Sequence, residues 1–239
     1  MSRCRWYFEA HSSCITVTRG GAILFLCLFN GWLQLSEGFE AVAGRPMLAR
    51  HRQFAFHRPS AVVIARAIVD VPFLLVQCLL TTVIVWGLAG LRREAGAFFI
   101  YLVYVFLSAY NRTALYRGIA AFSATFLEAI RYSVLSLNII IIFVGYVIRR
   151  PQMNWLIWLS YINGISYAFE GMLNNEIAYD IPCNPQQIVP FSEPRNPTYQ
   201  TCALTGSRPG SLIVPAADYL GTTFGYSVLL LDRSSSQGT

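Results

Sequence analysis

Four long runs of apolar residues dominate the first part of this 239-residue chain. They cover residues 21–35, 61–91, 97–110 and 132–148. A helix crosses the hydrocarbon core of a bilayer with about 20 apolar residues, because each residue adds about 1.5 Å of rise. The second run meets that length by itself, and four such runs are not typical of a soluble domain. The pattern therefore predicts an all-α membrane protein with about four transmembrane helices.

A few charged residues and one proline lie in or next to these apolar runs, and each needs a structural explanation. Arg66 and Asp70 lie four residues apart, which predicts an ion pair on one helix face near the membrane edge. Pro72 follows, and the sequence does not decide whether it kinks the helix. Arg112 follows the third run, where a charge costs about 3 kcal/mol or more unless it snorkels or faces a cavity. The first run is short, so we expect it to continue through residues 36–42 as an amphipathic helix.

The second part of the chain has a different character. Residues 154–177 are rich in Trp and Tyr, which favour the membrane–water interface, so we expect one or two short helices at that surface or dipping into it. We divide the chain into a disordered lead-in (1–18), the transmembrane helices (19–148), a large extracellular loop with interfacial helices (149–227) and a tail (228–239).

Basic residues set the expected orientation. The segment 37–60 holds four Arg and two His, and such a cluster marks a cytoplasmic loop. By parity, the turn at Arg92 lies outside, residues 117–131 lie inside, and the polar loop beyond residue 180 lies outside.

Composition excludes several classes of protein. Only 13% of the residues are charged, and all 18 basic residues are Arg. Without Lys the chain has neither the P-loop lysine that binds nucleotide phosphates nor a Schiff-base amine. The sequence also contains no HExxH, no paired carboxylates at useful spacing and no nucleophile elbow, so we expect no enzyme. The Arg residues are scattered at the ends of apolar runs, which does not indicate nucleic-acid binding.

The cysteines divide into two kinds. Cys27 and Cys78 lie inside apolar runs and are expected to be small buried hydrophobic residues. Cys183 and Cys202 lie in the polar loop without the CxxC or His spacing of a zinc site, so we expect a disulfide on the oxidising side and no metal site.

A series of short motifs runs through the chain in a fixed order. They are RGG (19–21), FN (29–30), LSE (35–37), GRP (44–46), HRPSA (57–61), DVP (70–72), LRREAGAFF (91–99), LYR (115–117), YINGISYAFE (161–170), NNE (174–176), IPC (181–183), VP (189–190), Cys202, Gly206, PG (209–210) and DYL (218–220). The full series over about 200 residues resembles one membrane domain of the fungal pleiotropic-drug-resistance ABC transporters, G-type exporters, and is most similar to the N-terminal of their two membrane domains.

The resemblance implies a transport role. Such proteins move hydrophobic compounds, drugs or lipids, across the plasma membrane, and ATP with Mg²⁺ binds in separate ATPase domains rather than in the membrane helices. It implies as partners the lipid bilayer, ABC ATPase domains, a second membrane half and hydrophobic small molecules, with no nucleic acid. It also implies an integral, multi-pass membrane location.

Two sets of candidate site residues follow from the resemblance. Candidates for the substrate path are Phe29, Asn30, Leu33, Ile139, Ile140 and Phe143. Candidates for contact with the ATPase domain are Arg50, His51, Arg52, His57 and Arg58. For each path residue, lipid contact or core packing is the alternative, and for the basic residues it is contact with solvent or lipid headgroups.

The chain departs from the family pattern in its extent. The resemblance covers neither an ATPase domain nor the first transmembrane helix, and it reaches four of an expected six helices. We therefore expect the transmembrane part of an ATP-driven exporter. The alternative is a truncated membrane protein that does not transport and acts by association or has no function.

Overall fold

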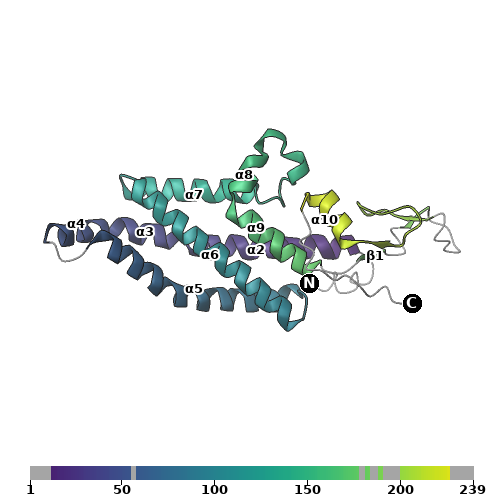
Figure 1. The fold of residues 1–239 in the computed structure, drawn as a ribbon, viewed down its shortest axis with the longest axis horizontal. Coiled ribbons are helices and arrows are strands. Elements are labelled where there is room, and N and C mark those ends of the chain that lie inside the picture. Colours follow the sequence, from purple (N-terminus) through teal and green to yellow (C-terminus); the bar gives the residue numbers. More distant parts are fainter. Residues whose placement is uncertain (1–11, 55–57, 178–180, 184–187, 191–199, 227–239) are drawn as a thin grey trace.

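The computed structural model describes residues 12–54, 58–177, 181–183, 188–190 and 200–226. They form an elongated helical body with α4 at one end and α10 and the strands at the other (Figure 1). The helices are α2 (Ser12–Leu33), α3 (Leu35–Ala43), α4 (Arg45–Gln53), α5 (Pro59–Ala89), α6 (Ala95–Phe122), α7 (Phe126–Ile142), α8 (Ile157–Ile162), α9 (Gly164–Glu176) and α10 (Ala216–Phe224), with 3-10 turns η1 (Arg150–Gln152) and η2 (Asn154–Leu156). The strands are β1 (Ile181–Pro182), β2 (Ile188–Val189), β3 (Thr201–Cys202) and β4 (Ile213–Val214).

Within the described residues, three helical stretches are long and apolar enough to cross a membrane. They are Arg19–Ala43, Ser60–Ala89 and Ala95–Phe122. The second begins beside Pro59, whose missing N–H costs nothing in the first turn, and α5 ends at Gly90 with a left-handed φ of 60°. The predicted all-α membrane fold is confirmed.

The fourth apolar run forms a helix that lies six residues closer to the N-terminus than its pattern predicts. The run predicts a span over residues 132–148, whereas α7 covers Phe126–Ile142, 17 residues. Its start is set by a capping box, in which the Thr125 side chain accepts from the Glu128 N–H and the Glu128 carboxylate accepts from the Thr125 N–H. Beyond Ile142 the chain turns, and Gly145 adopts a φ of 105° that ends the helical path.

The first apolar run forms a longer helix than its pattern predicts. α2 begins at Ser12, so residues 12–18 of the expected lead-in are helical. After a break at Gln34, α3 supplies the expected amphipathic extension, with Leu35 and Gly38 on its buried face. The division of the chain into a lead-in, a loop region and a tail stays a prediction.

α6 is the central helix of the body. It contacts α2, α3, α5, α7 and α9, and Figure 1 shows it crossing between its neighbours. Its buried positions recur every three or four residues, so one stripe of the helix faces the core. They include Ala97, Tyr101, Val105, Ala109, Thr113, Tyr116 and Ala120.

The end of the body opposite α4 is built from the aromatic segment and the polar loop. Residues 154–177 form two main helices, α8 and α9, but α9 packs against α6, with Phe169 and Met172 fully buried, rather than lying on a surface. Among the described strands, β1 pairs with β4 and β2 with β3, both antiparallel. Cys183 and Cys202 form a disulfide with a Cα–Cα distance of 5.9 Å, and Cys27 and Cys78 are buried free thiols.

Glu176 ties this end together through three helices. Its carboxylate lies 2.6 Å from the Arg19 guanidinium of α2 and also accepts from the Tyr101 hydroxyl of α6 and from the backbone N–H of Arg92. Its side chain is almost fully buried, so these donors replace the water that it loses.

Arg150 forms a second buried cluster at the same end. It pairs with Glu170 at 2.9 Å and lies 4.6 Å from the ring centre of Tyr226. Burial raises the pKa of the Tyr226 phenol, so the hydroxyl stays protonated and donates to the Val144 carbonyl at 3.2 Å.

The disulfide leads to a mapping prediction. Digestion of the unreduced chain should yield one peptide pair linking Cys183 to Cys202, and reduction should separate it. Alkylation of Cys27 and Cys78 only after unfolding serves as the control for buried free thiols. Free thiols at both loop positions before reduction would contradict the pairing.

Gly206 leads to a stability prediction. Its φ of 84° is left-handed, and an added Cβ would lie 2.8 Å from the backbone of Asp218. Gly206→Ala should therefore lower the free energy of unfolding by about 1–3 kcal/mol, measured by thermal unfolding in detergent. Gly96→Ala is the matched control, because a Cβ there meets nothing within 4 Å. Equal stability of the two variants would argue against the described loop packing.

Candidate functional site: a substrate path and a charged joint

The residues of the predicted substrate path come from α2 and α7, which meet at one point. An added Cβ on Gly31 would lie 3.0 Å from the Leu137 side chain, so the helices approach closely there. Phe29 and Leu33 lie two residues either side of Gly31 and are 43% and 40% exposed. Ile139 is 42% exposed on α7. These three apolar side chains are therefore accessible, but residues two positions apart in a helix do not share a face, so they point away from the contact at Gly31.

The other α7 candidates are less exposed. Ile140 is partly buried against the core, and its carbonyl accepts a hydrogen bond of 2.8 Å from the Asn163 side chain at the start of α9. Phe143 is also partly buried and forms the C-cap of α7. These two residues sit where α7 meets the helices of the opposite end.

Asn30 points away from the exposed face of α2. It is 1% exposed, its amide donates to the Leu26 carbonyl at 2.9 Å, and it lies 3.4 Å from the Thr81 hydroxyl of α5. An amide buried among helices needs such partners, since an unmet one costs roughly 1–3 kcal/mol. Asn30 thus joins α2 to α5, while its neighbour Phe29 stays on the accessible face.

Three charged residues near the α4 end form what we call the charged joint: Glu37, Asp70 and Arg117. The Arg117 guanidinium of α6 lies 2.6 Å from the Glu37 carboxylate of α3 and also pairs with Asp70 of α5. The three side chains are between 18% and 27% exposed. The charged joint therefore links three helices where water is scarce and charges need partners.

The predicted local pair between Arg66 and Asp70 is wrong. Arg117 reaches Asp70 from α6, whereas the Arg66 side chain lies over Gly44, where an added Cβ would come within 3.0 Å of its guanidinium. Spacing along one helix could not reveal a cation on another helix. The sequence signal that was available is the LYR motif, which ends at Arg117.

Arg112 is the second buried cation of α6. It is 1% exposed and donates to the Cys27 carbonyl of α2 at 2.7 Å. It neither snorkels nor is exposed; it fills the space beside Gly31, where an added Cβ would lie 1.6 Å from its guanidinium. Its Nε and Nη2 have no hydrogen-bond partner among the described residues. A glycine on α2 thus makes room for an arginine on α6.

The predicted coupling residues lie at the α4 end of the body. Arg50 is exposed, His51 is partly buried beside Met47, and Arg58 is the exposed N-cap of α5. Arg52 belongs to α4, and His57 lies outside the described residues. Figure 1 places α4 at the tip of the body, away from the disulfide end.

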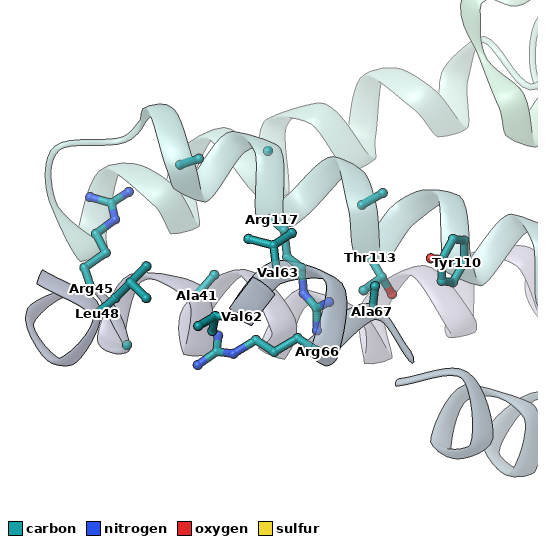
Figure 2. Close-up of a pocket in the computed structure, with 14 residues that line it drawn as sticks. Ala41, Arg45, Leu48, Val62, Val63, Arg66, Ala67, Tyr110, Thr113 and Arg117 are labelled. Carbon is teal, nitrogen blue, oxygen red and sulfur yellow. The ribbon is translucent and has the colours of Figure 1, made fainter. Parts of the chain in front are cut away.

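A cavity of about 590 Å³ lies beside the charged joint, between the α3–α4 corner, α5 and α6. Figure 2 shows Arg45 and Leu48 at one end, Tyr110 and Thr113 at the other, and Arg66 and Arg117 between them. No cluster of three or more His, Cys, Asp or Glu residues suited to a metal ion occurs in the part of the chain that the structure describes.

Two protein families match the sequence of this chain. Residues 6–177 match the ABC-2 type transporter family, and residues 189–233 match the CDR ABC transporter family. The chain belongs to the ABC-2 type transporter family. The first match covers the helices from α2 to α9, and the second begins in β2 and continues beyond α10.

Curated relatives agree with the predicted branch of the family. The chain is 42% identical over 227 residues to the ABC multidrug transporter atrF of Aspergillus fumigatus, a match that covers 93% of this chain and 15% of that protein. It is 34% identical over 216 residues to the ATP-dependent permease PDR10 of Saccharomyces cerevisiae, covering 87% and 13%. It is also 35% identical over 214 residues to ABC transporter G family member 21 of Dictyostelium discoideum, covering 85% and 14%. The chain thus spans about 15% of the length of these relatives.

These matches settle the class of this ABC-2 type chain. It is an integral, multi-pass membrane part of an ABC transporter, and this part is not a catalytic domain. The roles of the individual path and coupling residues stay predictions.

The charged joint leads to a stability prediction. Arg117→Gln leaves Glu37 and Asp70 facing each other without their cation, so the free energy of unfolding should fall by about 2 kcal/mol, less than for a fully buried pair because the groups are partly exposed. Adding Glu37→Gln and Asp70→Asn removes the repulsion and should restore most of that loss. Thermal unfolding in detergent tests both; an equal loss in the triple variant would show that the charges are not coupled.

Proposed function

We propose that this chain is the transmembrane part of an ATP-driven exporter that moves hydrophobic compounds out of the cell, with the ATPase domains supplied outside its residues 1–239. The ABC-2 family match over residues 6–177 is the observation that carries the proposal. It is supported by the relatives named as a multidrug transporter and an ATP-dependent permease.

The substrate path in this proposal runs along the accessible faces of α2 and α7. Phe29, Leu33 and Ile139 present apolar surface there, which suits adaptable binding of apolar compounds. Asn30 supports the path indirectly by holding α2 against α5. A second membrane half would cover these faces and complete the cavity.

In this proposal the ATPase domain contacts the α4 end of the body, and its movement is transmitted to the membrane helices from there. Arg50, His51 and Arg58 lie at the tip of the body, where an ATPase domain can reach them. α4 contacts α3, and the charged joint links α3 to α5 and α6, so a displacement of α4 would be passed to all three helices. ATP and Mg²⁺ would bind in the ATPase domains.

The proposed orientation in the membrane follows from the chemistry of the two ends of the body. The basic α4 end faces the cytoplasm under the positive-inside rule, and the end with the Cys183–Cys202 disulfide faces the oxidising exterior. The plasma membrane is the location at which export of drugs or lipids removes them from the cell.

Reconstitution tests the proposal. The chain is placed in proteoliposomes with a partner that carries two ATPase domains and the second membrane half, and ATP turnover is measured with and without the apolar dye Nile red. We expect the dye to stimulate turnover several-fold. Phe29→Ala and Leu33→Ala should each reduce this stimulation a few-fold, because each removes apolar contact area from the path.

Phe73→Ala is the matched control, since Phe73 is 73% exposed on α5, a helix that carries none of the proposed path residues. It should leave the stimulation unchanged. Arg50→Ala should lower dye-stimulated turnover while dye binding persists. The proposal is rejected if ATP turnover never responds to any apolar compound with any such partner.

A further inference from the structure

The cavity beside the charged joint has walls suited to a hydrocarbon chain. Small and apolar side chains line most of it, among them Val62 and Ala67 of α5 and Ala114 and Gly118 of α6. At Gly118 an added Cβ would meet nothing within 4 Å, so the space in front of it is open. About 590 Å³ is enough for a substantial part of a lipid or a drug-sized molecule.

The charge on the cavity wall is of one sign. Its charged lining residues are Arg45, Arg66 and Arg117, with no carboxylate among the lining residues. Arg117 is already neutralised by Glu37 and Asp70 in the charged joint. The available cations are therefore Arg45 and Arg66.

Neither of these two arginines belongs to an ion pair formed among the described residues. Arg45 donates through Nη1 to the Ser123 carbonyl at 2.6 Å, and its buried Nη2 has no partner among those residues. The Arg66 guanidinium is directed over Gly44. Guanidinium groups that have no carboxylate partner and lie in front of an apolar wall favour a ligand with both an anionic group and a hydrocarbon chain.

The depth of the cavity matches one leaflet of a bilayer. Arg66 lies seven residues into α5 and Arg117 five residues before the end of α6, so both lie within roughly 12 Å of the ends of their spans at about 1.5 Å per residue. The hydrocarbon core is about 30 Å thick, which puts this level at the headgroups and first methylenes of the leaflet on the α4 side.

We propose that this cavity binds one anionic phospholipid of the cytoplasmic leaflet, with its phosphate held by Arg45 and Arg66 and an acyl chain lying against Val62, Ala114 and Gly118. The α4 end is the cytoplasmic end under the proposed orientation, and that leaflet carries the anionic lipids. The site lies between the α3–α4 corner, α5 and α6, and its lining contains none of the residues proposed for the substrate path. Its test measures lipid binding alone, so it can fail or succeed independently of transport.

The headgroup is tested by native mass spectrometry of the purified chain in detergent with added phosphatidylserine or phosphatidylcholine. One phosphatidylserine should be retained per chain, several-fold more tightly than phosphatidylcholine. Arg66→Gln should weaken phosphatidylserine binding about five-fold, the effect of one basic residue near an anionic lipid. Arg93→Gln, which removes the same charge from the loop between α5 and α6, outside the cavity lining, should leave binding unchanged.

The part of the cavity proposed to hold the acyl chain is tested by filling it with a larger side chain. Gly118→Leu places a side chain in the open cavity without a clash and should abolish retention of the lipid. Gly96→Leu is the matched control on the same helix, because its Cβ also meets nothing within 4 Å, and it lies outside the cavity lining. Both substitutions favour the helix, so loss of folding is not the expected cause of any difference.

Several outcomes would overturn the proposal. Equal retention of the two phospholipids, or unchanged phosphatidylserine binding in Gly118→Leu, would show that the cavity selects neither charge nor chain. Displacement of the lipid by millimolar inorganic phosphate would assign the arginines to a free anion. A dimer that carries no lipid while the monomer does would assign the cavity to a protein contact.

Discussion

Charged side chains inside a membrane must find their partners on other helices, and α6 carries the cations that impose this requirement. Arg117 draws α3 and α5 together through the charged joint, and Arg112 holds α2 through the Cys27 carbonyl. Near the other end of α6, Tyr101 reaches Glu176 of α9. Because water cannot replace these partners in hydrocarbon, they determine which helices surround α6.

This distribution of polar contacts divides the body into three levels. Polar networks centred on Glu176 and on the charged joint tie the helices near the two ends of α6. Between them, Arg112 of α6 fits against Gly31 of α2, and Asn30 of α2 contacts Thr81 of α5. Polar contacts therefore join the helices at all three levels.

The success of the sequence-based predictions depended on how far apart the interacting residues lie in the chain. Hydropathy alone located α5 and the first half of α6, because membrane insertion is a property of each segment, but α6 continues past the predicted run to Phe122. Both ends of α7 were missed, since a capping box at Thr125 sets its start and the chain turns before Gly145, which has a positive φ. The Arg66–Asp70 pair was predicted wrongly, because the competing cation is on α6.

By itself, the sequence specified a multi-pass helical membrane protein of the ABC-2 type. The lengths of the apolar runs indicated the membrane helices, and the ordered motif series indicated the family, since both are read directly along the chain. The tertiary structure was needed to pair Asp70 with Arg117, to turn Asn30 away from the face that carries Phe29, and to fit Arg112 against Gly31. Each of these depends on which helix lies beside which, and on the depth at which they meet. Neither quantity is encoded in the periodicity of a single helix.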